Sequence, residues 1–262
     1  MNICQIEPIL YIVQNHIRKN GVFRSAEKSC FSDLQNYQRG EAQAMSFKSN
    51  CDAVVAALSE IRIVPVLVLN DVESGLKMCE VLSECGLPAA EITFRTDAAE
   101  AVIQAAAKRF PDLYLGAGTI LNTTDLHRAF NAGAKFAVAP GFNPTVVKEA
   151  IANEWAFAPG VCTPSEAEQA MELGCRFLKF FPAEAAGGVK MIQSLIAPYK
   201  HLGIRFMPTG GVTTANVANY LAVKEIVAVG GTWLGKSADI EAGNWDAIRT
   251  AVKDAVALKQ NL

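Results

Sequence analysis

A lysine stands inside an apolar segment, Arg176 to Phe181, that has the length and composition of a buried strand. Gly174 precedes this segment and Pro182 follows it, as is typical of strand boundaries. Apolar surroundings disfavour the ammonium form of a lysine, and a neutral amine can attack a carbonyl to form a Schiff base. Lys179 is therefore a candidate nucleophile. The alternatives are a lysine that extends to the strand end or one that is paired to a buried carboxylate.

A carboxylate and an arginine occur at a second apolar segment, Ala89 to Phe94. Glu91 lies inside the segment, where it could form a buried ion pair with Lys179 or Arg95. The same geometry would allow Glu91 to move protons beside a Schiff-base lysine. Arg95 follows the segment and offers a planar fork of donors that suits a substrate carboxylate, although it could also be an exposed loop arginine.

Hydroxyl and glycine residues follow other predicted strands. Thr119 and Thr163 each follow one, and either could bind a substrate or cap a helix. Thr209-Gly210-Gly211 and Gly230-Gly231-Thr232 follow the last two strands, and each leads into a predicted helix. Backbone N–H groups at such a place can hold a phosphate; the alternative is that the glycines only form tight turns.

The elements that must position these residues alternate regularly between strand and helix. The predicted strands are 63–69, 89–94, 113–117, 136–139, 156–158, 176–181, 205–207 and 226–229. The helices that follow them are predicted at 71–85, 97–109, 123–132, 144–153, from 163 onward, 188–197, 214–221 and 245–258. This order predicts an α/β protein with the (β/α)8 architecture of a TIM barrel, in which the C-terminal ends of the strands meet at one mouth.

An open, doubly wound sheet is the alternative fold. It would normally show a Gly-x-Gly-x-x-Gly turn after its first strand, and this chain has none there. Gly116-Ala117-Gly118 comes at the end of the third strand and lacks the third glycine. The barrel is therefore favoured.

The length and composition agree with one barrel: the chain has 262 residues, and 51% of them are hydrophobic. The net charge of −2 provides no positive electrostatic potential that would attract nucleic acid or a membrane surface. No apolar run reaches the roughly 18 residues of a membrane span. Seven cysteines without a Cys-x-x-Cys pair predict reduced thiols in a cytoplasmic protein. Three separated histidines, His16, His127 and His201, predict no metal site.

Residues 1–44 differ from the rest of the chain. One apolar patch, residues 9–13, precedes a polar stretch, and no targeting pattern is present. We expect a single folded unit over residues 45–262. Residues 1–44 are expected to be poorly ordered or to come from an upstream reading misassigned to the gene. The alternative is that residues 9–13 pack on the barrel as an extra helix.

Four groups of residues resemble the bacterial 2-keto-3-deoxy-6-phosphogluconate (KDPG) aldolases, also called 4-hydroxy-2-oxoglutarate (KHG) aldolases. The resemblance runs in order and in register from about Ser49 to the C-terminus. Its motifs are Glu-Ile-Thr-Phe-Arg-Thr at 91–96, Gly-Ala-Gly-Thr at 116–119, Lys-Phe-Phe-Pro-Ala-Glu at 179–184 with Gly-Gly-Val-Lys at 187–190, and Pro-Thr-Gly-Gly at 208–211.

The resemblance implies a class I aldolase, a carbon–carbon lyase without metal or other cofactor that assembles as a homotrimer of (β/α)8 barrels. Such an enzyme splits KDPG into pyruvate and D-glyceraldehyde 3-phosphate, and also 4-hydroxy-2-oxoglutarate into pyruvate and glyoxylate. By resemblance, Lys179 forms the Schiff base and Glu91 is the general acid and base. The residues implied to contact substrate are Arg95, Thr119, Pro140, Thr163, Phe181, Thr209, Gly210, Gly211, Gly231 and Thr232.

Two departures and three alternatives accompany this resemblance. Thr232 stands where serine is expected, which keeps the hydroxyl, and residues 1–44 have no counterpart. The related 6-phosphogalactonate aldolase is one alternative reading. A metal-dependent pyruvate aldolase is disfavoured by the scattered histidines. A non-catalytic sugar-phosphate-binding barrel would keep the glycine pairs but would have no use for Lys179 beside Glu91.

Overall fold

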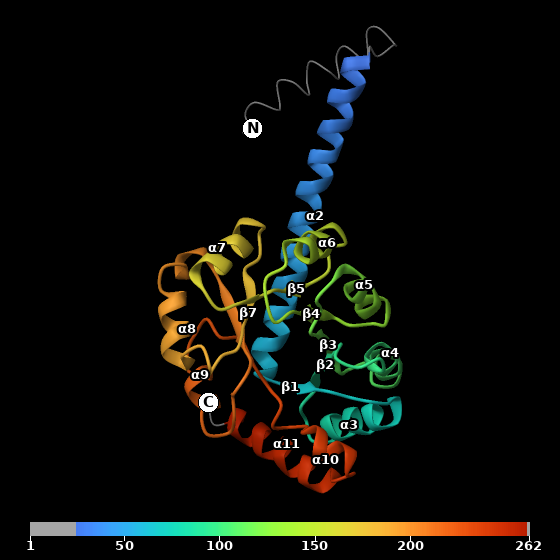
Figure 1. The fold of residues 1–262 in the computed structure, drawn as a ribbon, viewed down its shortest axis with the longest axis vertical. Helices are drawn as coiled ribbons and strands as arrows, with labels where there is room; N and C mark the ends of the chain where they lie inside the picture. The colour runs from blue at the N-terminus through green and yellow to red at the C-terminus, as the bar shows by residue number, and fades with distance from the viewer. Residues whose placement is uncertain (1–24, 261–262) are drawn as a thin grey trace. The chain divides into compact units, whose positions relative to one another are not determined.

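The structure is a computed structural model that describes residues 25–260 (Figure 1). The chain divides into two units between Ala42 and Gln43, and helix α2 (Ser25–Ile61) runs through this division. Within the described residues, none of the helices combines the length and hydropathy that crossing a membrane requires. The candidate chemistry lies entirely in the second unit.

Parallel strands form the centre of the second unit. One sheet has the order β5-β4-β3-β2-β1-β9 and the other has the order β6-β7-β8. The strands are β1 (Ile63–Leu67), β2 (Ala89–Thr93), β3 (Tyr114–Gly118), β4 (Phe136–Val138), β5 (Phe157–Ala158), β6 (Gly160–Val161), β7 (Phe177–Phe180), β8 (Arg205–Pro208) and β9 (Val229–Gly231). Nearly all of their residues are buried, as expected for parallel strands covered by helices.

The two sheets join at both edges and close into a barrel. β5 and β6 are two parts of one extended segment on either side of Pro159; β5 pairs with β4, and β6 pairs with β7. At the other edge, isolated bridges join Phe206 to Ile226 and Thr209 to Gly230, so that β8 meets β9. β9 in turn pairs with β1. The predicted (β/α)8 architecture is confirmed.

Helices surround the strands (Figure 1). They are α3 (Val72–Glu84), α4 (Ala99–Arg109), α5 (Thr123–Asn131), α6 (Pro144–Ala152), α7 (Pro164–Glu172), α8 (Gly188–Ile196), η1 (Lys200–Leu202), α9 (Val217–Leu221), α10 (Ser237–Glu241) and α11 (Trp245–Gln260). The short elements η1 and α10 were not predicted. The helix predicted from 214 begins at Val217, because the Asn216 side chain first accepts the Thr213 N–H in a turn.

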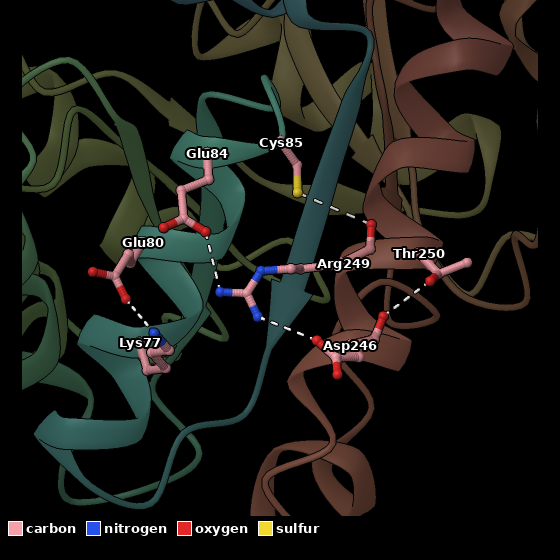
Figure 2. A network of polar contacts seen from close by, with 7 residues as sticks. All are labelled: Lys77, Glu80, Glu84, Cys85, Asp246, Arg249 and Thr250. Carbon is pink, nitrogen blue, oxygen red and sulfur yellow. Dashed lines mark hydrogen bonds and ion pairs between the residues drawn. The ribbon is translucent and has the colours of Figure 1, made fainter.

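The last helix packs beside the first helix of the barrel (Figure 2). Arg249 of α11 donates to Glu84 of α3 at 3.1 Å, and its other terminal nitrogen lies 3.7 Å from Asp246. The Cys85 thiol lies 4.0 Å from the Arg249 carbonyl oxygen. Ion pairs as accessible as these contribute little stability, so the buried apolar side chains between the helices hold them together.

The eighth strand lies later in the chain than predicted. The sequence predicted residues 226–229, whereas β9 is Val229–Gly231. The Arg62 guanidinium donates to the carbonyl oxygens of Ile226 at 3.0 Å and Val227 at 3.2 Å. These carbonyl groups are thus satisfied by a side chain, and the regular ladder begins only after them.

Helix α2 spans 37 residues and ends just before the first strand. Its C-terminal part buries Phe47, Cys51, Val54 and Leu58, whose spacing places them on one face. Ser46 and Asn50 on the same part donate to the side chain and the carbonyl of Glu154, at 2.8 and 2.7 Å. The expectation of disorder for residues 1–24 lies outside the described residues. Residues 25–44 are helical, and the proposed boundary near Met45 stays a prediction.

Candidate active site

Lys179 of β7 and Glu91 of β2 form a buried ion pair inside the barrel. The distance from Lys179 Nζ to Glu91 Oε1 is 2.8 Å, and the two residues are 5% and 0% exposed. Among the described residues, Glu91 Oε2 has no hydrogen-bond partner. The pair is thus shielded from water, and one carboxylate oxygen remains available for a proton or a substrate hydroxyl.

Glycines of β3 make room for the side chains of Glu91 and Phe136. The ladder places Glu91 opposite Gly116 and Thr93 opposite Gly118. A Cβ atom on Gly118 would lie 2.2 Å from Glu91 Oε1, and one on Gly116 would lie 2.2 Å from the Phe136 ring. The Gly116-Ala117-Gly118 motif is therefore a packing feature of the barrel interior rather than a nucleotide-binding turn.

The strand β2 and the turn after it bring three polar side chains to a cavity at the C-terminal ends of the strands. Glu91, Thr93 and Arg95 are two residues apart and all line it. Thr93 Oγ1 donates to the Leu67 carbonyl oxygen at 2.9 Å and accepts from Arg95 Nε at 3.3 Å. Thr93 was not predicted as a site residue, although the period of two from Glu91 to Arg95 would have identified it.

The cavity at the C-terminal ends of the strands has a volume of about 260 Å³. It brings together every site residue predicted from the sequence except Thr163. Its lining consists of Val66, Glu91, Thr93, Arg95, Thr119, Pro140, Lys179, Phe181, Thr209, Gly210, Gly211, Val212, Gly231 and Thr232. Val66 and Val212 were also missed, because an apolar wall residue carries no chemical signal in a sequence.

Thr163 serves as a helix cap in the structure. Its hydroxyl accepts the Glu166 N–H at 3.3 Å, and the Glu166 side chain accepts the Thr163 N–H at 2.9 Å. This reciprocal capping box begins α7, and Thr163 itself is exposed. Of the two readings that the sequence left open for Thr163, the structure supports the cap.

The glycine pairs form one end of the cavity. Gly210 and Gly211 have φ values of +100° and +81°, a left-handed backbone that other residues rarely adopt. The two five-residue helices that follow the pairs, α9 and α10, begin only at Val217 and Ser237. The helix predicted from 214 thus begins three residues later, and neither glycine pair leads directly into a helix. Backbone groups are therefore what this end offers a ligand.

Two threonines add hydroxyl groups to the cavity. Thr209 is 6% exposed, and its Oγ1 has no hydrogen-bond partner in the described part of the chain. Thr119 has a φ of +60°, an uncommon conformation for a β-branched residue. Strain of this kind is concentrated at functional sites, where surrounding structure maintains it. Both threonines line the cavity, and the unpartnered Thr209 hydroxyl is a group that a polar ligand could satisfy.

Over residues 25–260, no group of three or more His, Cys, Asp or Glu side chains is arranged to hold a metal ion. Five cysteines whose side chains the structure describes are free thiols: Cys51, Cys79, Cys85, Cys162 and Cys175. Burial raises the pKa of the Cys51, Cys79 and Cys175 thiols to about 12. These three cysteines therefore serve as small apolar core residues.

Comparisons with known proteins agree with this geometry. The family model for KDPG and KHG aldolase matches residues 54–251. The chain is 41% identical over 203 residues to the 2-dehydro-3-deoxy-phosphogluconate aldolase of Haemophilus influenzae, which covers 78% of this chain and 95% of that protein. It is 40% identical over 194 residues to the KHG/KDPG aldolase of Escherichia coli K12, which covers 74% and 90% of the two chains.

A solved structure shares the fold and carries a trapped intermediate. It is a KDPG aldolase from Legionella pneumophila with pyruvate captured as a covalent carbinolamine. The TM-score is 0.72 at 31% identity, and the match covers 76% of this chain and 96% of that one.

Proposed function

Because the chain belongs to the KDPG and KHG aldolase family, we propose that it is a class I aldolase that cleaves KDPG into pyruvate and D-glyceraldehyde 3-phosphate. This is the aldol cleavage of the Entner–Doudoroff route of sugar acid breakdown. The observation that carries the proposal is the buried pair in which Lys179 Nζ lies 2.8 Å from Glu91 Oε1. A sugar-phosphate-binding barrel without catalysis would need neither group in the interior.

The reaction follows from the chemistry of these two side chains. Glu91 is within hydrogen-bond reach of the Lys179 amine, so it can accept the proton that the ammonium group must lose before it attacks. The free amine adds to the C2 carbonyl to give a carbinolamine. Glu91 returns its proton to the carbinolamine hydroxyl, which leaves as water and gives a protonated imine with Glu91 again a carboxylate. The imine draws the electron pair of the C3–C4 bond as that bond breaks.

Glu91 then acts on the C4 hydroxyl, directly or through a water molecule. Removal of this proton releases the aldehyde product and leaves an enamine on Lys179. The enamine is protonated at C3, and water hydrolyses the imine to give pyruvate and the free lysine. The water lost during imine formation is returned in this step, so the net reaction is a cleavage without any other reactant.

The two ends of the cavity suit the two ends of the substrate. Arg95 and Thr119 would hold the carboxylate beside the Schiff base, because a guanidinium and a hydroxyl both donate to oxygen. Gly210, Gly211 and Thr232 would hold the phosphate. A substrate held at both ends presents its scissile bond to Lys179 in a fixed orientation.

Pro140, Phe181, Thr209 and Gly231 complete the walls around this substrate. Thr209 would donate or accept at a substrate hydroxyl, because its Oγ1 has no partner among the described residues. The shorter 4-hydroxy-2-oxoglutarate would use the same lysine and leave the phosphate end empty, giving pyruvate and glyoxylate. The enzyme would work in the cytoplasm. It would assemble as a homotrimer, and sedimentation analysis of the purified protein would test this oligomeric state.

A coupled assay tests the proposed reaction. Purified protein is mixed with KDPG, and released pyruvate is followed with lactate dehydrogenase and NADH. We expect turnover that EDTA leaves unchanged, and slower turnover of the epimer 2-keto-3-deoxy-6-phosphogalactonate. A preference for the galactonate epimer would favour the related aldolase. Ligand-induced thermal stabilisation without pyruvate release would favour a binding barrel instead.

A further inference from the structure

Glu184 lies just after the Lys179 strand and is bonded to the loop that follows β8. Its backbone N–H donates to the Gly210 carbonyl oxygen at 3.0 Å, and the N–H of Ala183 donates to the Thr209 carbonyl oxygen at 2.9 Å. These two bonds join the exits of β7 and β8. They continue the pairing of the strands beyond the point where the ladder ends, at Phe180 and Pro208.

The Glu184 side chain lies against the same loop. A Cβ atom on Gly211 would be 2.6 Å from Glu184 Cβ, so the glycine backbone packs directly on the glutamate stem. Glu184 Oε1 accepts a hydrogen bond from the hydroxyl of Tyr220 on α9. Tyr220 is fully buried, and burial together with this hydrogen bond raises the pKa of its phenol, which therefore stays protonated and able to donate.

Gly210 and Gly211 need such support more than other residues would. Both have positive φ and no side chain, so their backbone has wide conformational freedom unless neighbours restrict it. A phosphate site made of backbone N–H groups depends on these groups being fixed before the ligand arrives. The hydrogen bond from Tyr220 also directs one oxygen of Glu184 toward α9. This direction favours phosphate binding, because a carboxylate turned toward the ligand would repel a phosphate.

We propose that Glu184, held by Tyr220, is a positioning residue for the phosphate end of the cavity. It touches no substrate and acts by fixing the Gly210-Gly211 backbone. The inference rests on the proposed function, because it assumes that a phosphorylated substrate uses this end. The inference goes beyond the proposed function because it assigns a role to Glu184, the last residue of the Lys-Phe-Phe-Pro-Ala-Glu motif, and to Tyr220 on α9.

The test compares two substrates that differ in the phosphate end. Glu184→Ala and Tyr220→Phe should each raise the KM for KDPG about fivefold to tenfold, the effect of losing one hydrogen bond that positions a binding group. Their kinetic constants for 4-hydroxy-2-oxoglutarate should change less than twofold. Glu184→Gln keeps an acceptor for the Tyr220 hydroxyl and should restore the KM for KDPG to near the unmodified value.

Glu168→Ala is the matched control. Glu168 accepts a hydrogen bond from the Tyr199 hydroxyl at 2.7 Å, but this pair is exposed and does not line the cavity. Its removal should leave both substrates unaffected. Inorganic phosphate, used as an inhibitor competitive with KDPG, should bind less tightly to Glu184→Ala and Tyr220→Phe than to Glu168→Ala.

The outcomes separate this inference from the proposed function. If the unmodified protein cleaves neither substrate, the proposed function fails. If the unmodified protein cleaves both substrates, and Glu184→Ala and Tyr220→Phe each lose kcat/KM by the same factor on KDPG and on 4-hydroxy-2-oxoglutarate, the positioning role is overturned. Failure of both variants to fold would likewise assign the pair a purely structural role and overturn the inference.

Discussion

A Cβ atom on Gly118 would lie 2.2 Å from Oε1 of Glu91, the same oxygen that contacts Lys179 at 2.8 Å. The position of the Glu91 carboxylate thus depends on the absence of a side chain on the neighbouring strand. Gly118→Ala should push Glu91 away from Lys179 and lower kcat by ~10², the lower end of what general acid–base catalysis contributes.

Steady-state kinetics with KDPG measure this effect. Gly141→Ala is the control, because a Cβ atom there would meet nothing within 4 Å. An unchanged kcat in Gly118→Ala would show that Glu91 does not need its observed position.

Glu91 itself can be tested by removing its charge while keeping its shape. Glu91→Gln should still form some imine with pyruvate but lower kcat by ~10² to 10⁴, because the amide cannot accept the C4 hydroxyl proton. Single-turnover measurements separate imine formation from bond cleavage. A near-normal kcat would mean that Glu91 only pairs with Lys179 structurally.

The proposed phosphate end can be tested by substituting one of two glycines, Gly210 or Gly231. A Cβ atom on Gly231 would lie 1.5 Å from the Trp233 ring, so substitution there would disturb packing, whereas one on Gly210 would be 3.2 Å from Phe181. Gly210→Ala should therefore lower kcat/KM for KDPG much more than for 4-hydroxy-2-oxoglutarate.

Gly203→Ala controls for backbone strain in this comparison, because Gly203 also has a positive φ but nothing within 4 Å of the added atom. Equal losses on the two substrates in Gly210→Ala would mean that the glycine only shapes the barrel.

The barrel and most of the residues that line its cavity could be predicted because they depend on local signals. Alternating strands and helices determine the fold class, and a charged residue within an apolar strand, such as Lys179 or Glu91, stands out from its neighbours. The strand ends then place these residues at one mouth without knowledge of any contact.

The parts that were missed depend on contacts distant in sequence. β9 begins late because Arg62 satisfies the carbonyl groups of Ile226 and Val227, more than 160 positions away. The fit of Gly118 against Glu91 also joins two strands, and no pattern within either strand reveals it.

Thr163 was ambiguous for a local reason, because a threonine before Pro-Ser-Glu suits a capping box as well as a substrate contact.

The boundary near Met45 can be tested by shortening the chain. The side chains of residues 35–42 are exposed, and Phe47 is the first described residue of α2 that is buried in the core. A chain that begins at Met45 should therefore keep its activity and its melting temperature. A fall of several degrees, which corresponds to more than ~1 kcal/mol for a domain of this size, would show that the preceding residues belong to the fold.

Trapping with borohydride tests the central claim most directly. Pyruvate and sodium borohydride are added to the purified protein, and the modified lysine is located by peptide mass mapping. The reduced imine should appear on Lys179 alone, because among the lysines whose side chains the structure describes it is the one buried beside a carboxylate at the cavity. Modification of the exposed Lys190 or Lys224, or no modification at all, would contradict the account of this protein as a Schiff-base aldolase.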